Sequence, residues 1–133
     1  KLKTHLQYEN YLCDIKTGSH RSALTKLRTS SHNLNVETGK YTRPKTRLCD
    51  RLCAECKLVE DEFYFVLRCP RYDNERFQLY KKINELCPNF TNLDDQNKFI
   101  YLMIVEGDVA RATAKFCHLA FEKRKEILYP SQL

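Results

Sequence analysis

Apolar residues recur every three or four positions along most of the chain, and polar or turn-forming residues interrupt this pattern between segments. Such spacing places one side of a helix against a core and leaves the other side in water. It predicts helices at 6–15, 19–28, 61–69, 72–86, 94–107 and 108–129. The sequence therefore predicts an all-α domain of about five helices with an irregular cysteine-bearing insert, which carries the short segment at 61–69.

Helix-capping residues mark several of these boundaries. Either Asn92 or Asp94 is expected to begin a helix that ends at Gly107, and Asp108 is expected to cap the last one. The segment at 61–69 is ambiguous, because its aromatic residues favour strand while its first, acidic residues suit the start of a helix; we assign it to a short helix. The positions expected to face the core are Ala23, Leu24, Leu27, Tyr72, Leu79, Ile83, Leu86, Phe99, Leu102, Met103, Val109, Ala112, Phe116, Leu119, Ala120 and Ile127.

The 133 residues fit one compact domain with one modest core. We divide it into a basic helical part with its connector (1–48), the cysteine-bearing insert (49–72) and the carboxyl-terminal helices (73–133). The connector at 29–47 is polar and contains one glycine and one proline, so it is expected to form a loop or a short extended segment.

Cysteine usage and apolar runs bear on the cellular compartment. The seven cysteines are odd in number and irregularly spaced, which argues against a secreted disulfide framework. No apolar run approaches the roughly 20 residues of a membrane-spanning helix, and the polar amino-terminal residues predict no signal peptide. The expectation is an intracellular protein, nuclear or cytoplasmic, with no membrane partner.

The positive charge is concentrated in the first half of the chain. Residues 1–56 contain eleven Lys and Arg against five Asp and Glu, a net of +6, whereas residues 57–133 contain twelve of each. Such asymmetry is typical of a surface that binds a polyanion, most often nucleic acid (RNA or DNA) or anionic lipid, although a solvated basic face is the simpler alternative. The residues expected to bind nucleic acid are Arg21, Lys26, Arg28, Lys40, Tyr41, Arg43, Lys45, Arg47 and Arg51, where Tyr41 either stacks on a base or anchors the loop.

Three cysteines in the insert form the most informative pattern. Cys53 and Cys56 form a Cys-x-x-Cys pair, and Cys69 follows after about a dozen residues. Three thiolates at this spacing suit a tetrahedral zinc ion. A redox pair is the rival interpretation, but it normally follows a buried strand in a βαβ unit, and no such pattern is present. Burial of the cysteines as small apolar side chains is the remaining alternative.

Candidate catalytic groups are few. Cys49 or Cys53 could form a nucleophilic dyad with His32, but the sequence supplies no orienting partner and no oxyanion site. Asp94 and Asp95 could be a catalytic carboxylate pair, but they stand where a helix needs an acidic start. The chain contains no glycine-rich phosphate loop. We therefore expect a non-catalytic protein.

The order of motifs resembles that of a known family. "ALTKLRTSSHNLNVETGKYTRP", "RLCAECKLVEDEFYFVLRCPRY", "NKFIYLM" and "AFEKRKEI" follow one another along the chain. Over roughly 11–127, this order is similar to the carboxyl-terminal region after the reverse transcriptase domain in LINE-type (non-long-terminal-repeat) retrotransposon polyproteins of animals. The resemblance implies a zinc-knuckle module that helps grip template RNA or target DNA, beside a reverse transcriptase domain that this chain lacks.

The resemblance also implies a ligand set. The family pattern is Cys-x-x-Cys, then Asp-Glu-x-His, then Cys-Pro, so Cys53, Cys56 and Cys69 match three ligand positions. Tyr64 stands where the family has its histidine, and a neutral phenol is a poor zinc ligand. Cys49, His32 or water is then the expected fourth ligand. The alternative function is a protein-interaction or structural helical domain, or a degenerate relic, without nucleic-acid binding.

Overall fold

A computed structural model describes residues 18–30, 32, 34–53 and 56–128. Every element in this part of the chain is helical, apart from one antiparallel bridge between Leu52 and Val59. This confirms the predicted all-α class, while the helix predicted at 6–15 lies outside the described residues. The helices are α2 (Gly18–Arg28), α3 (Asn35–Thr38), α4 (Glu62–Leu67), α5 (Asp73–Leu86), α6 (Asp95–Ile104) and α7 (Asp108–Leu128), with short 3-10 helices η1 (Gly39–Tyr41), η2 (Leu48–Asp50), η3 (Pro70–Tyr72) and η4 (Phe90–Asn92).

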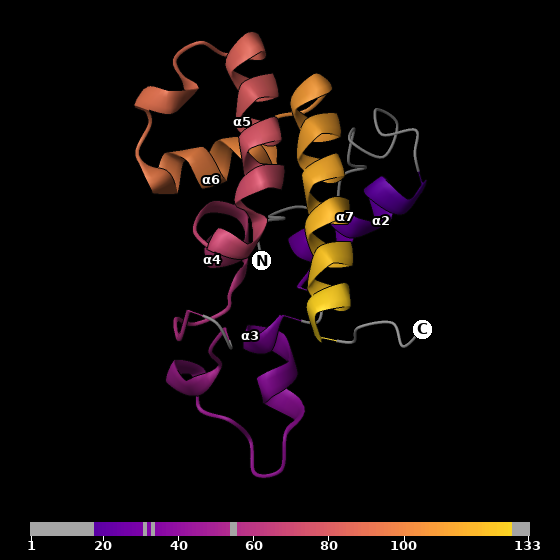
Figure 1. Cartoon of the computed structure of the whole chain (residues 1–133), viewed down its shortest axis with the longest axis vertical. Coiled ribbons are helices and arrows are strands. Elements are labelled where there is room, and N and C mark those ends of the chain that lie inside the picture. Colours follow the sequence, from indigo (N-terminus) through magenta and orange to yellow (C-terminus); the bar gives the residue numbers. More distant parts are fainter. Residues whose placement is uncertain (1–17, 31, 33, 54–55, 129–133) are drawn as a thin grey trace.

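The long helix α7 lies at the centre of the bundle. Helix α2 packs along one side of it and α5 along the other, while α6 contacts both α7 and α4 (Figure 1). Large apolar side chains fill the space between them, including Leu24 from α2, Phe65 from α4 and Phe116 from α7. Burial of each such side chain contributes about 1.5–3 kcal/mol to folding. The segment between α3 and η2 projects from the far end of this bundle (Figure 1).

The predicted helix boundaries are largely confirmed. Asp61 caps α4 by accepting a hydrogen bond from the Tyr64 backbone N–H at 2.8 Å, and Asp94, rather than Asn92, caps α6. Helix α6 ends at Ile104, three residues before the predicted stop, and Asp108 is the first residue of α7 instead of its cap. The connector at 29–47 is less extended than expected, since it contains α3 and η1.

Three residues expected in the core are more than one-third exposed. Leu86 is the last residue of α5, and Ile127 lies in the final turn of α7. Leu119 faces an open groove of about 610 Å³ between α5 and α7. Within the described residues, no helix combines the length and the apolar character that crossing a bilayer requires.

Candidate metal centre and basic loop

A short hairpin, described at residues 51–53 and 56–60, presents Cys53 and Cys56, two of the three cysteines of the predicted metal site. The Cys53 N–H donates to the Leu58 carbonyl at 2.7 Å, and the Lys57 N–H donates back to the Cys53 carbonyl at 2.9 Å. Lys57 has a φ of +61°, which lets the chain reverse direction immediately after Cys56. The turn therefore brings the sulfurs of Cys53 and Cys56 to the same side of the hairpin.

The third cysteine comes from the end of α4. Its helix stops at Leu67, and the Cys69 N–H donates to the Tyr64 carbonyl at 2.9 Å, which turns the chain back toward the hairpin. The sulfurs of Cys53, Cys56 and Cys69 lie within 4.8 Å of one another, with Cys56 the most exposed. Sulfurs bound to one tetrahedral zinc ion are about 3.8 Å apart, so a small closure suffices. These three cysteines are close enough to hold a metal ion.

The Tyr64 hydroxyl lies beside these sulfurs. The side chain is buried, its oxygen has no regular hydrogen-bond partner, and burial together with the neighbouring thiols raises the pKa of the phenol well above its ordinary value. The same hydroxyl lowers the pKa of Cys56, but burial and the other two thiols outweigh it, so that this pKa is raised overall. Three neighbouring thiolates repel one another, which is why the other two thiols raise the pKa of Cys56. A divalent cation among the sulfurs would offset this repulsion, because it favours the thiolate form.

The structure does not bring either candidate fourth ligand to the three cysteines. Cys49 is exposed in η2. His32 lies with Glu37 and Glu62, since ligand atoms of these three residues are within 4.8 Å of one another. Neither Cys49 nor His32 is therefore part of the sulfur cluster, which leaves water as the remaining predicted fourth ligand.

His32 has a structural role instead. Its Nδ1 accepts a hydrogen bond from the Leu34 N–H at 3.2 Å, so a neutral ring carries its proton on Nε2, which lies 3.6 Å from Glu62 Oε2. A protonated Nε2 has no lone pair for a metal. Burial alone would raise the pKa of Glu62, but the contact with His32 and a backbone hydrogen bond lower it. The pair ties the segment before α3 to the start of α4.

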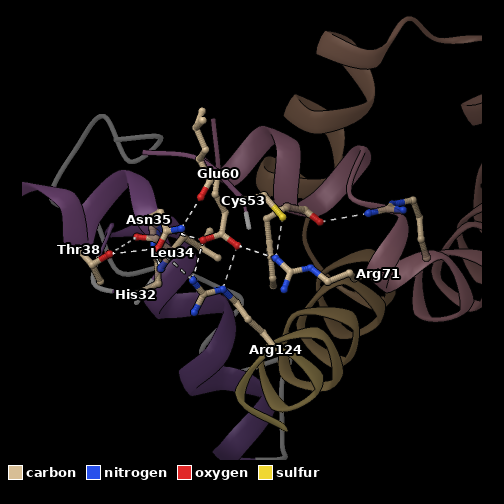
Figure 2. Close-up of polar contacts among 11 residues, drawn as sticks. His32, Leu34, Asn35, Thr38, Cys53, Glu60, Arg71 and Arg124 are labelled. Carbon is tan, nitrogen blue, oxygen red and sulfur yellow. Dashed lines mark hydrogen bonds and ion pairs between the residues drawn. The ribbon is translucent and has the colours of Figure 1, made fainter. Parts of the chain in front are cut away.

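A buried ionic network adjoins the sulfur cluster (Figure 2). Arg71 Nη2 lies 2.7 Å from Cys53 Sγ and 3.3 Å from Glu60 Oε2. On the other side of the same carboxylate, Arg124 donates to Oε1 at 2.6 Å and to Oε2 at 3.0 Å. The Asn35 N–H completes the set, donating to Oε1 at 2.7 Å. Glu60 thereby joins the hairpin, α3, η3 and α7.

The charges of this network fit a divalent cation among the sulfurs. Such an ion with three thiolates carries one net negative charge, and Glu60 adds another. Arg71 and Arg124 supply the two positive charges that balance them. Although burial opposes it, contact with the neighbouring sulfurs raises the pKa of Arg71, which keeps its guanidinium charged. Since buried charges are tolerated only when paired, the donor set and its surroundings suit a metal such as zinc.

These three charged residues were missed by the sequence analysis. Arg124 gives one usable signal, because it lies four positions after Ala120 and eight after Phe116, on the apolar side of α7. Glu60 and Arg71 give none, since a charged residue beside a turn is ordinarily exposed.

The basic loop, defined as residues 39–47, contains most of the residues that are predicted to bind nucleic acid. Lys40, Tyr41, Arg43, Lys45 and Arg47 are all exposed on it. The loop projects from the end of the bundle (Figure 1). Two other residues predicted to bind nucleic acid lie on α2, outside the loop: Lys26 is exposed and Arg21 is half-buried. Arg28 and Arg51 are buried, so they are not part of the predicted basic surface.

Arg51 holds the loop in place from within. Its Nε donates to the Thr46 carbonyl at 3.0 Å, and its Nη1 donates to the Val36 carbonyl at 2.9 Å. The same side chain passes so close to Gly39 that a Cβ at that position would lie 2.6 Å from Arg51 Cγ. Because Arg51 also begins the cysteine hairpin, one residue links the loop to the sulfur cluster.

Comparisons with protein-family models, with curated proteins and with solved structures gave no match to this chain. The resemblance to the carboxyl-terminal region of retrotransposon polyproteins therefore stays a prediction from the sequence. The case for a function rests on the sulfur cluster and on the basic loop beside it.

Proposed function

We infer that this chain is a non-catalytic nucleic-acid-binding module, stabilised by zinc at Cys53, Cys56 and Cys69, whose basic loop contacts phosphates. The observation that carries the proposal is the gathering of three sulfurs within 4.8 Å at the turn of a hairpin. The base of that hairpin, through Arg51, holds the basic loop. The sequence resemblance adds a context in which such a module grips the template or target of a retroelement polymerase.

Zinc is favoured over redox chemistry by the surroundings of the cysteines. A redox-active pair needs an accessible attacking thiolate at the start of a helix. Here Cys53 is buried, the pair lies in a hairpin turn, and a third thiol shares the site. When bound, zinc supplies a cross-link between the hairpin and the end of α4, so its binding free energy is also folding free energy. Arg71 then neutralises the thiolates, and Tyr64 shields them from water.

The charge pattern of the basic loop favours phosphate as its ligand. Lys40 pairs with Glu37 at 2.9 Å and Arg47 pairs with Asp50 at 2.9 Å, so these two cations are partly neutralised. Arg43 and Lys45, at the tip, have no anionic partner in the part of the chain that the structure describes. Two uncompensated cations on a projecting loop are placed to displace counterions from a nucleic-acid backbone.

The metal claim is tested by elemental analysis of the purified full chain. We expect one zinc per chain, lost together with part of the thermal stability in Cys56→Ser. Cys49→Ser is the matched control, because this cysteine is exposed and outside the cluster, and it should retain the metal. Tyr64→His should bind zinc more tightly, since it restores a nitrogen ligand beside the sulfurs. Equal metal content in the Cys49 and Cys56 variants would exclude the site.

The nucleic-acid claim is tested by titration at several salt concentrations. We expect the affinity to fall steeply with salt, and the double variant Arg43→Gln/Lys45→Gln to reduce the logarithmic salt slope by roughly 1.4–1.8. Lys81→Gln/Lys82→Gln on α5 removes the same charge from another exposed surface and should leave the slope nearly unchanged. Absence of binding at micromolar concentrations, or equal slopes for the two double variants, would refute the proposal.

Exposed apolar residues favour one second candidate, a protein-interaction domain. Phe77 on α5 is 65% exposed, and Ile104 at the end of α6 is 58% exposed. If this candidate is correct, Phe77→Ser and Ile104→Ser abolish association with a partner protein, while RNA and DNA binding is absent from the unmodified chain.

A further inference from the structure

The ring of Tyr41 is displayed on the basic loop without being packed. It is 80% exposed, the highest value among the large apolar and aromatic residues that the structure describes. The neighbouring Gly39 is buried under Arg51, so the backbone beside Tyr41 is fixed while its ring is left in water. The sequence alone left open whether Tyr41 anchors the loop, and its exposure excludes that role.

The loop keeps its shape through its own hydrogen bonds. The Thr46 N–H donates to the Gly39 carbonyl at 3.0 Å and lies 2.8 Å from Thr42 Oγ1. The two threonine hydroxyls are 2.6 Å apart, and Arg51 holds the Thr46 carbonyl from below. A loop closed in this way loses little conformational freedom when it binds, so its exposed groups are presented in a fixed arrangement.

We propose that the basic loop prefers single-stranded nucleic acid to duplex, with Tyr41 stacked on an unpaired base while Arg43 and Lys45 contact the flanking phosphates. This inference rests on the proposed nucleic-acid function and names the form of nucleic acid that the loop takes. The three side chains fall within five consecutive residues of one turn, and they combine an exposed aromatic ring with two cations that have no anionic partner among the described residues.

The preference follows from what each form of nucleic acid offers to this loop. The two cations can contact phosphates of either form. The face of a base is accessible to an aromatic side chain only where the base is unstacked, in single strands, loops and ends. In a duplex the Tyr41 ring gains nothing, because neighbouring bases cover both faces. The ring therefore adds affinity for single strands alone.

The test is fluorescence anisotropy of the full chain with a labelled single-stranded oligonucleotide and with the duplex of the same sequence. Tyr41→Ala should weaken single-strand binding about 5–150-fold, the equivalent of the 1–3 kcal/mol that one base–aromatic stack contributes. Tyr41→Phe keeps the ring and should bind like the unmodified chain. Duplex binding should change in neither variant. Because Tyr41 is exposed, its replacement should also leave the melting temperature unchanged.

The possible failures are distinguishable. If the unmodified chain binds neither oligonucleotide, the proposed function fails and this inference fails with it. If binding is observed and depends on Arg43 and Lys45, but Tyr41→Ala has no effect or weakens both forms equally, only the stacking inference is overturned. Binding to anionic lipid vesicles with the same dependence on Tyr41, and to neither oligonucleotide, would overturn both.

Discussion

Replacing Glu60 by Gln is the sharpest test of the buried ionic network. The side chain is about 2% exposed and accepts three hydrogen bonds from two guanidinium groups, together with one from the Asn35 N–H. Glutamine has the same shape but no charge, so Arg71 and Arg124 would be left as buried cations without their shared anion. Unpairing a buried ion pair in this way costs about 3–5 kcal/mol.

That loss is large relative to the total free energy of unfolding of a domain of this size, which is about 5–15 kcal/mol. We expect the melting temperature of Glu60→Gln to fall by roughly 10–20 °C. The assay is thermal unfolding followed by circular dichroism, at matched zinc content. Glu126→Gln, at an exposed position on α7, is the control and should change the free energy of unfolding by less than about 0.5 kcal/mol.

A second variant separates charge from packing. Arg124→Met combined with Glu60→Gln removes one of the two unpaired cations, so the double variant should be more stable than the sum of the two single losses predicts. A melting temperature for Glu60→Gln within a degree or two of the unmodified chain would refute the reasoning, since the network would then contribute nothing to folding.

Three further predictions concern other parts of the molecule. Gly39→Ala should weaken nucleic-acid binding and lower stability, because the added Cβ would lie 2.6 Å from Arg51 Cγ; Gly18→Ala on α2 is the control, since a Cβ there would meet only Arg21 Nη2, at 3.8 Å. Burial raises the pKa of Cys117 to about 12, so at pH 8 iodoacetamide should modify the exposed Cys49 in the folded chain and reach Cys117 only in denaturant, as mass spectrometry of digests would show; early labelling of Cys117 would contradict this. Burial, a neighbouring histidine and a lysine lower the pKa of His20, so folding stability should decline as the pH falls through about 6.5, the pKa of the unfolded state. Denaturant midpoints at pH 7.5 and 5.5 check this, and an unchanged pH dependence in His20→Gln would show the inference to be wrong.

The helices could be predicted because their determinants are local. The apolar periodicity of α2 and α5 and the capping carboxylates of α4 and α6 lie within each segment, so the sequence alone locates them. The stop of α6 was misplaced, because Gly107 has the φ of a helix-ending residue, +71°, but lies next to the start of α7. The local sequence does not show whether this glycine ends α6 or only precedes the start of α7.

The site was predictable only in part, for the same reason. The cysteine spacing identified Cys53, Cys56 and Cys69, which the structure does bring together. Arg51 and Glu60 are buried because they pair with residues distant in sequence. The positive charge of the first half of the chain was assigned to the surface as a whole, so the burial of Arg51 was not predicted. His32 was a predicted metal ligand that the structure places elsewhere, because its Nε2 contacts the Glu62 carboxylate.

The position of Arg124 near the end of α7 bears on how the molecule opens. Terminal helical turns ordinarily fray, and their amides exchange with solvent long before those of the core. Here that turn is fastened to Glu60, 64 residues earlier in the chain. Unwinding of α7 past Arg124 would break its ion pair with the buried Glu60 carboxylate. The amides in the last turns of α7 should therefore stay protected against deuterium exchange, and lose that protection together with the amides of the hairpin that contains Glu60.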